Sequence, residues 1–354
     1  MKHKRLILCT LLTAALGSCA KPLPEKDGNL PPGDEELVQI FFRADEDGSK
    51  VTETDGDDFI RRWAVFVFDQ EAPWSAYATS SQQGHIPMTL RRGRSYHCCA
   101  VVNYPLSGPC ALVPSAIQEE ARLHEKITAL DDNAPDAFVM YGRTTLLVTE
   151  ASQQVGIPVR RTVSRIDVQR IEVDFGDNSA LASKTFTLKH IYLTNVYRTT
   201  RYGADYSFAE LSDSRSAWYN TMGRHRGEEP VSGMDALLEE RDLNFTLRAD
   251  RPYTLRHSFY VCPNPTPPEE DSHDSGFWSK RSSRIVLETT LDGETLYYQA
   301  TLPEMARNHL YVAGNIRIRG KGSKDPEELV YDPEDPPIVI DWHDEWDRDD
   351  EKEI

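Results

Sequence analysis

The sequence predicts an all-β protein of two β-sandwich domains, with one short helix in the first domain. Three observations favour this fold. Short apolar runs rich in β-branched and aromatic residues alternate with Gly, Pro, Asn and Asp. The chain has 354 residues, more than one core usually covers. A second series of such runs begins near Arg160, so we place the domains at residues 34–159 and 160–331.

The first 19 residues have the features of an export leader. Residues 2–5 are basic, and the apolar run 6–16 is shorter than the roughly 20 residues that span a bilayer. The sequence Leu16-Gly17-Ser18-Cys19 resembles the lipobox of bacterial lipoproteins, in which the Cys is acylated. We expect a lipid on Cys19 that holds the protein at a membrane; the alternative is an ordinary leader with a coincidental Cys. Residues 20–33 are rich in Pro and charge, which is typical of a tether.

The first domain contains the expected strands 37–42, 63–68, 96–102, 144–149 and 156–159. A helix is expected to interrupt them. Ser115 is its candidate N-cap, with Gln118 at the reciprocal position of a capping box. Four apolar residues share one face of this helix: Ala116, Leu123, Ile127 and Leu130.

The second domain begins with a strand over residues 163–173. Ile166 and Val168 alternate in one phase and Ile171 and Val173 in the other, which predicts a bulge between the pairs. Residues 198–233 are polar and indicate a long loop or insertion. Residues 332–354 hold one last apolar run and then an acidic tail. Further strands are expected at residues 186–196, 244–247, 254–262, 284–290, 296–302 and 310–318.

Composition and motifs argue against several classes of function. The formal charge is −17, with 57 acidic against 40 basic residues and no basic patch among aromatics, which disfavours nucleic acid as a partner. No second apolar run approaches the length of a membrane-spanning helix, so we expect a soluble body. Because motifs such as a Walker loop and H-E-x-x-H are missing, we expect no enzyme activity and no cofactor. A solvated charge run, not a metal site, is the interpretation of Asp341, His343, Asp344 and Glu345.

The cysteines of the folded part leave two interpretations open. Cys98 and Cys99 are adjacent on a strand and therefore face opposite sides. Either one of them bridges to Cys110, or these three and Cys262 are buried free thiols. Since neighbours in a strand point apart, His97 is not expected to act as a base for Cys98. The spacing does not fit a zinc site.

A series of short segments follows Cys19 along the chain. These landmarks are residues 38–43 (VQIFFR), 65–69 (VFVFD), 101–103 (VVN), 140–142 (MYG), 161–166 (RTVSRI), 192–196 (YLTNV), 259–265 (FYVCPNP) and 307–312 (RNHLYV). Together and in this order they resemble the landmarks of the FimA-type fimbrillin family, the subunits of type V pili. The resemblance implies two transthyretin-like β-sandwich domains, export as a lipoprotein, cleavage after an Arg, and assembly by strand exchange.

Two segments alternate as strand exchange requires. Loss of the first strand would leave unpaired edges and an apolar groove. A strand of the same alternation from another copy would fill that groove, and repetition gives an open filament. The residues expected to be displaced are Val38, Ile40 and Phe42, and those expected to be the donor are Ile338, Ile340 and Trp342.

Processing is expected after Arg43, so that the mature subunit starts at Ala44. Arg43 is expected to close the first strand, and the loop 45–58 is polar and acidic, which suits a protease. Arg61 and Arg62 are poorer sites because they abut the next strand. Near the C-terminus, Pro333, Pro336 and Pro337 are expected to keep the donor strand from folding back into its own domain.

The function expected from these features is that of a structural subunit of a cell-surface pilus that supports adhesion. Its expected partners are other copies or related subunits, the outer membrane through Cys19, a processing protease, and a host or bacterial surface ligand. An anchor or tip subunit of the same pilus remains open. The alternative from another class is a surface glycan-binding lipoprotein, with an aromatic platform of Trp74, Tyr77, Trp218 and Tyr219.

Overall fold

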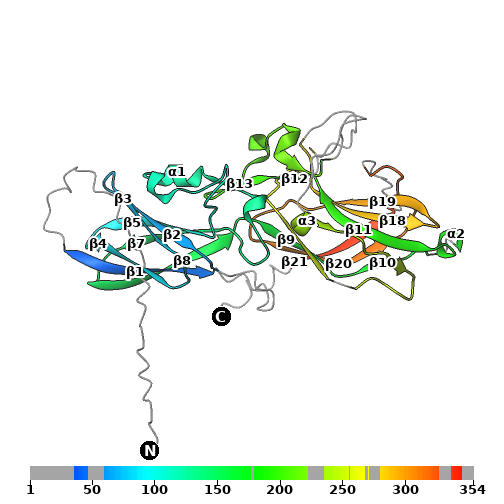
Figure 1. The fold of residues 1–354 in the computed structure, drawn as a ribbon, viewed down its shortest axis with the longest axis horizontal. Coiled ribbons are helices and arrows are strands. Elements are labelled where there is room, and N and C mark those ends of the chain that lie inside the picture. The colour runs from blue at the N-terminus through cyan, green and yellow to red at the C-terminus, as the bar shows by residue number, and fades with distance from the viewer. Residues whose placement is uncertain are drawn as a thin grey trace, which may run out of the picture.

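The computed structural model describes residues 36–46, 60–176, 179–221, 235–254, 256–267, 270, 280–326 and 336–344. It is built mainly of β-strands, arranged as two lobes that follow one another along the long axis (Figure 1). The prediction of an all-β sandwich protein is confirmed. The described helices are short: α1 (Glu120–His124), α2 (Ser179–Ala182) and α3 (Asp235–Leu238).

The first lobe is formed by a seven-stranded sheet with the order β3-β2-β5-β7-β8-β1-β4. β1 runs antiparallel to β4 and parallel to β8. The strands at the two ends of this order, β3 and β4, are also in contact, so the sheet curls around its core. The bounds are β1 (Leu37–Glu46), β2 (Trp63–Asp69), β3 (Ser75–Ser80), β4 (His85–Arg91), β5 (Ser95–Val102), β7 (Met140–Leu147) and β8 (Ser152–Arg161).

β2 and β5 are buried on both faces, which explains their nearly continuous apolar sequence. Trp63, Val65 and Val67 of β2 point into the core inside the curled sheet. Ala64 and Phe66 point outward into a second cluster, which α1 covers through Leu123. The alternation of a strand thus serves two cores at once.

The expected helix over residues 115–130 is wrong in its extent. The chain forms a 3-10 turn η1 (Pro114–Ala116), then α1, then strand β6 (Ile127–Ala129) and a second turn η2 (Leu130–Asp132). Ser115 lies inside η1, which has no side-chain cap. β6 pairs with β13 (Thr199–Arg201), a distant segment of the chain, and this tertiary pairing overrides the local helical pattern.

The second lobe contains two main sheets. One has the order β10-β20-β9-β17, with β21 on the free side of β20, and the other has the order β15-β11-β18-β19, with β16 also on β11. The first sheet comprises β9 (Ser164–Val168), β10 (Ile171–Val173), β17 (His257–Val261), β20 (Leu310–Ile318) and β21 (Ile338–Asp344). The second comprises β11 (Phe186–Thr194), β15 (Glu239–Glu240), β16 (Phe245–Leu247), β18 (Arg284–Leu291) and β19 (Glu294–Thr301).

The bulge predicted in the first strand of this lobe is present. β9 and β10 are successive parts of one path along β20. Ile166 and Val168 before the interruption, and Ile171 and Val173 after it, are all buried in the same core. The two residues between them reverse the phase of the alternation.

The segment 198–233, expected as a long loop or insertion, has secondary structure over its described part. β13 and β14 (Trp218–Tyr219) are short strands, and β14 pairs with β12 (Val196–Tyr197). Between them lie the 3-10 turns η3 (Phe208–Glu210) and η4 (Arg215–Ala217). The buried Trp218 packs against Tyr197 and Leu211 in a small cluster of its own, which a reading of polarity alone does not reveal. Residues 222–233 lie outside the described part.

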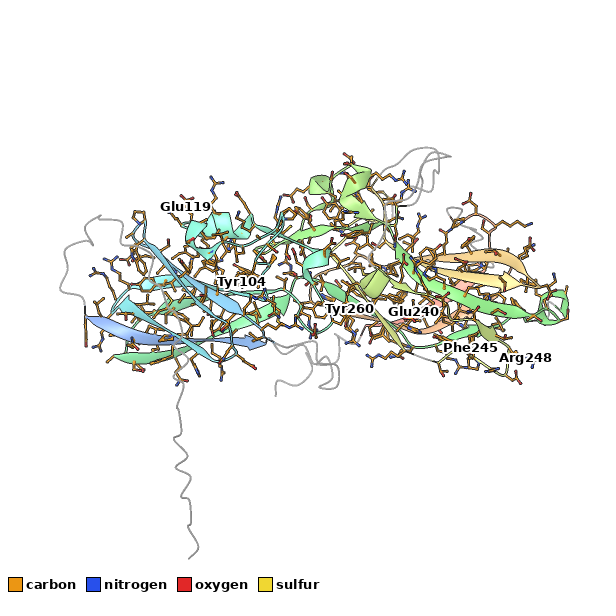
Figure 2. All side chains as sticks on the ribbon, viewed as in Figure 1. Tyr104, Glu119, Glu240, Phe245, Arg248 and Tyr260 are labelled. Atoms are coloured by element: carbon orange, nitrogen blue, oxygen red, sulfur yellow. The ribbon has the colours of Figure 1, made fainter. Side chains whose placement is uncertain are left out.

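The two lobes are joined by packing as well as by the chain. The rings of Phe138 and Tyr260 have their centroids 4.4 Å apart, and Tyr260 lies where the lobes meet (Figure 2). Arg307 donates to the main-chain oxygens of Arg201 and Tyr202 at 3.0 and 2.7 Å. The change from the first core to the second falls between Val159 and Val163, and the domain boundary at residues 159 and 160 stays a prediction.

Asparagines in three of the landmark segments occupy positions with positive φ. Asn103, Asn195 and Asn308 have φ of 53°, 56° and 58°, a region that Asn tolerates better than most residues. Asn103 accepts a hydrogen bond from the Arg61 amide at 2.9 Å, and Asn308 accepts one from the Arg161 amide at 3.1 Å. These side chains fix the chain where strands end.

Candidate assembly sites at the first and last strands

β1 lies between β8 and β4 in the first sheet. Its ladder with β4 runs from Leu37 opposite Arg91 to Arg43 opposite His85. Its parallel ladder with β8 runs from Gln39 to Glu46. A strand with neighbours on both sides satisfies main-chain donors and acceptors of three strands at once.

The three inward side chains of β1 are fully buried. The exposed fractions are 3% for Val38 and 0% for Ile40 and Phe42, and all three belong to the core inside the curled sheet. Each contributes roughly 1.5–3 kcal/mol by burial. If β1 left, β4 and β8 would lose their ladders and the core would open along its whole length.

Arg43 does not end β1, contrary to expectation. The strand continues to Glu46 because β8 is longer than β4 and carries the ladder past Arg43. Arg43 is exposed and sits opposite His85 on β4 and Gly156 on β8, and Ala44 is half-buried opposite Ile157. Beyond Arg43 only β8 pairs with this strand among the described residues. Cleavage after Arg43 therefore requires the last residues of β1 to separate from β8.

The poorer candidate cleavage sites are engaged by side-chain contacts. Arg61 pairs with Asp136, and Arg62 donates to the Tyr104 main-chain oxygen at 3.1 Å. Cys19 and the loop 47–59 lie outside the described residues.

The last strand, β21, pairs with β20 of its own chain, contrary to the expectation that prolines keep it apart. Pro337 helps to seat it, because its main-chain oxygen accepts from the Arg319 and Gly320 amides at 2.9 and 3.4 Å. An ion pair of 2.8 Å joins Arg317 and Asp341 across the two strands. β20 would otherwise leave an unpaired edge, which β21 covers.

We call the place of β21 beside β20 of its own chain its home position. The three candidate donor side chains are not equally buried there. Ile338 is 8% exposed and belongs to the core of the second lobe, so the expectation that the donor stays outside its own core is wrong for this residue. Ile340 and Trp342 are only half-buried at the margin of that core. β20 is the one strand that pairs with β21 in the part of the chain that the structure describes. β21 is thus an edge strand with an incompletely buried apolar face.

The four cysteines of the described part are free thiols, and all are buried. Cys98 points into the core inside the sheet and Cys99 into the outer cluster, as expected for neighbours on a strand. Burial raises the pKa of the Cys99 thiol to about 12 and raises the pKa values of Cys98 and Cys262 further. These thiols are protonated at neutral pH and are poor nucleophiles.

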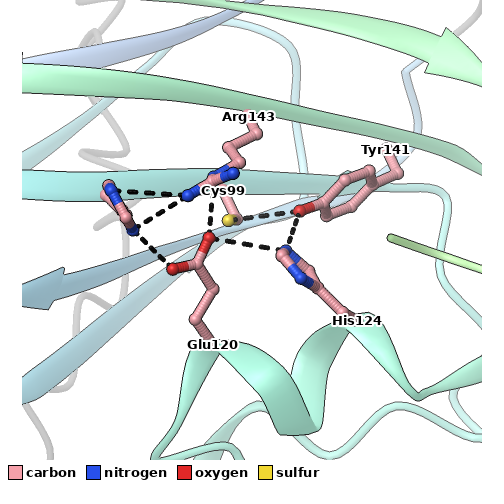
Figure 3. A network of polar contacts seen from close by, with 6 residues as sticks. Cys99, Glu120, His124, Tyr141 and Arg143 are labelled. Atoms are coloured by element: carbon pink, nitrogen blue, oxygen red, sulfur yellow. Dashed lines mark hydrogen bonds and ion pairs between the residues drawn. The ribbon is translucent and has the colours of Figure 1, made fainter. Parts of the chain in front are cut away.

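One polar cluster on the outer face of the first sheet was not anticipated. Cys99, Glu120 and His124 place ligand atoms of the kind that zinc prefers within 4.8 Å of one another (Figure 3). The Tyr141 hydroxyl lies 3.3 Å from the Cys99 sulfur and 2.8 Å from His124 Nε2, and the Arg143 guanidinium lies 2.7 Å from Glu120. The cluster therefore works as a hydrogen-bonded clamp that fastens α1 onto β5 and β7.

Two of the aromatic residues proposed as a glycan platform are inside the protein. Trp218 and Tyr219 are 0% and 4% exposed, so neither offers a face to a sugar. Tyr77 packs against the outer cluster, and Trp74 lies edge-on to Tyr96 at 6.0 Å between ring centroids. These four residues do not form one exposed surface. The described part of the chain also has no helix of the length and apolarity needed to cross a membrane.

The clamp gives a prediction for pH dependence. Burial lowers the pKa of His124 below 6.5, and Arg143 and His97 lower it too, while Glu120 opposes the shift. Below about pH 6.5 the unfolded chain therefore binds a proton that the folded chain does not, and stability falls as the pH falls. His190 and His257 have lowered pKa values for the same main reason. We expect His124→Gln to reduce this loss between pH 7 and 5, by at most about 1.4 kcal/mol per pH unit.

The measurement is the free energy of unfolding from denaturant curves at several pH values. Gln offers both a donor and an acceptor to the Tyr141 hydroxyl and removes the titration. A pH dependence of His124→Gln equal to that of the wild type would show that His124 is not shifted.

Comparisons with known proteins bear on the fold. No protein-family model and no curated protein sequence matches the chain. A proposed cell adhesion protein from Parabacteroides distasonis superimposes with a TM-score of 0.64 at 14% identity, over 88% of this chain and 98% of that one. A second, from Bacteroides eggerthii, has a TM-score of 0.63 at 16% identity, over 89% and 97%. A fimbrilin from Porphyromonas gingivalis has a TM-score of 0.54 at 12% identity, over 86% and 96%. The resemblance to FimA-type fimbrillins therefore extends to the fold of nearly the whole chain.

Proposed function

We propose that this protein is a structural subunit of a cell-surface pilus, joined to other copies or to related subunits by strand exchange. Its role is mechanical and adhesive rather than enzymatic. In support, a fimbrilin and two proposed cell adhesion proteins have solved structures with this fold. The observation that carries the mechanism is the unequal burial of two strands with the same alternation.

Strand exchange is expected to lower the free energy of the donor strand. At home, β21 has one neighbouring strand, and Ile340 and Trp342 are half-buried. In the place of β1 a strand has two neighbours, and its inward side chains are at most 3% exposed. A donor that moves from the first position to the second gains a ladder of hydrogen bonds and buries more apolar surface.

Removal of the first strand is the step that starts assembly in this proposal. A protease cuts after Arg43, and the mature subunit begins at Ala44. While β1 is in place the groove is closed, so assembly waits for the cut. An anchor subunit would keep its first strand, and a tip subunit would lack a working donor.

The most direct prediction concerns the joint, meaning the contact between the donor strand of one subunit and the groove left by β1 in the next. Ile340→Asp would place an uncompensated charge in the groove, which costs about 3–5 kcal/mol and weakens the joint more than about 100-fold. Val339→Gln is the matched control, because Val339 lies on the other side of β21 and Gln is the residue at the outward position 39 of β1. We expect Ile340→Asp to yield monomers on electrophoresis without boiling and Val339→Gln to yield ladders. Full-length filaments of Ile340→Asp would contradict the mechanism. Since Ile340 also packs at home, folding of each variant is checked by thermal unfolding.

Processing gives a second prediction. Arg43→Ala should leave a full-length subunit that is exported and does not polymerise, because β1 still fills the groove. Arg61→Ala is the control and should be cut normally, since the proposed site is unchanged. The measurement is N-terminal sequencing of polymerised wild-type material, which should begin at Ala44. A start upstream of Ala44 in the polymer would identify the chain as an anchor instead.

Membrane attachment gives a third prediction. We propose that Cys19 is acylated and that the subunit reaches the outer surface of the outer membrane as a lipoprotein. Cys19→Ala should lose labelling by a radioactive fatty acid and should lose surface display. Cys9→Ala should retain both, because Cys9 leaves with the leader. Normal labelling of Cys19→Ala would refute lipidation at this residue.

A further inference from the structure

The last strand matches the first strand in one direction only. Residues 338–343 read Ile-Val-Ile-Asp-Trp-His, and residues 38–43 read Val-Gln-Ile-Phe-Phe-Arg. When the two strands are aligned in the same direction, three inward positions correspond: Ile338 to Val38, Ile340 to Ile40, and Trp342 to Phe42. The next residue is His343 in the last strand and Arg43 in the first.

The direction matters because the groove has sites of different size. Phe42 is 0% exposed opposite Ile86, and Val38 is 3% exposed opposite Leu90. In the same direction Trp342 would occupy the Phe42 site, a modest increase in volume. In the reverse direction Trp342 would have to enter the Val38 site, and Ile338 would leave part of the Phe42 site empty. Overpacking and cavities each destabilise a core.

One interaction favours the reverse direction, and it is weaker. Arg92 pairs with Glu36 at 2.8 Å, and this partner is lost when the first strand is removed. A reversed donor would bring position 344, an Asp, to the place of Glu36. The Arg92–Glu36 pair is about half exposed, with side chains 47% and 58% accessible, and such solvent-exposed pairs add little stability compared with core packing. Packing of the aromatic side chain therefore decides the direction.

The change of partner strands is consistent with this choice. At home β21 runs antiparallel to β20, with Ile338 opposite Ile318 and Ile340 opposite Ile316. In the same direction as β1, it would run antiparallel to β4 and parallel to β8, as β1 does. Ile340 would then lie opposite Met88, another apolar side chain of the core.

We propose that β21 of a second copy enters the groove in the direction of β1, with Ile338, Ile340 and Trp342 at the sites of Val38, Ile40 and Phe42. The subunits then share one polarity at every joint. The inference rests on the proposed strand exchange and adds its direction and register.

Pairs of introduced cysteines distinguish the two directions. In the proposed register, position 343 takes the place of Arg43, opposite His85. In the reverse register, position 343 takes the place of Leu37, opposite Arg91. The 343–85 pair would lie in antiparallel strands, where directly opposite residues have Cα atoms about 4.5–5.5 Å apart. The 343–91 pair would lie in parallel strands, and neighbouring strands of either kind are about 4.7–4.9 Å apart. Both separations suit a disulfide. The variants are His343→Cys with His85→Cys, and His343→Cys with Arg91→Cys. The natural thiols of the described part are buried.

The polymer is oxidised and separated by electrophoresis after boiling without reductant. We expect a ladder of covalent oligomers from the 343–85 pair, none from the 343–91 pair, and none from the single variants. The unassembled subunit should give no 343–85 bond, because His343 lies opposite Val312 at home. A second pair, Val339→Cys with Thr89→Cys, should also crosslink, because Gln39 lies opposite Thr89.

Each other outcome overturns the proposal. A ladder from the 343–91 pair, alone or beside the first, would refute a single direction equal to that of β1. A polymer in which neither the 343–85 nor the 339–89 pair crosslinks would refute the register. Failure of the wild type to form boiling-sensitive oligomers at all is a different result, and it would refute strand exchange itself.

Discussion

The first lobe depends on the fact that β1 completes two ladders and one core at the same time. β4 and β8 do not pair with each other, and β1 is what lies between them. Its inward side chains meet those of β2, β5 and β8 in a single cluster. A strand at the edge of a sheet is lost with limited damage, but loss of β1 would divide a sheet and open a core. Only another strand of the same alternation can repair both defects.

The same constraint gives β21 features that fit the donor role proposed for it. As an edge strand at home, it satisfies the free side of β20 but leaves half of its apolar face at the surface. It can leave without dividing a sheet, although Ile338 must be withdrawn from the second core. The first lobe would thus have an open groove if β1 were removed, and the second lobe has an edge strand whose apolar face is incompletely buried.

Parts of the structure that depend on alternation were predictable from the sequence, and parts that depend on distant partners were not. The alternation of Val38, Ile40 and Phe42 predicts a buried strand face, and the change of phase between Val168 and Ile171 predicts a bulge. The end of β1 at Glu46 depends on the length of β8, which is more than 100 residues away in the chain. The sequence around Arg43 therefore does not predict where β1 ends. β6 has a helical pattern, yet it forms a strand because β13 pairs with it. The clamp around Glu120 unites residues of β5, α1 and β7 that no local motif connects.

Hydrogen exchange of the main-chain amides of residues 338–343 tests the central claim most directly. In the monomer β21 has one neighbouring strand, and its amides should exchange through local opening of that edge. In the polymer it should have a neighbour on each side and a fully buried face. We predict that its exchange slows by more than about 100-fold on assembly, while peptides from β18 and β19 are unchanged. Equal or faster exchange of β21 in the polymer would contradict strand exchange by this segment.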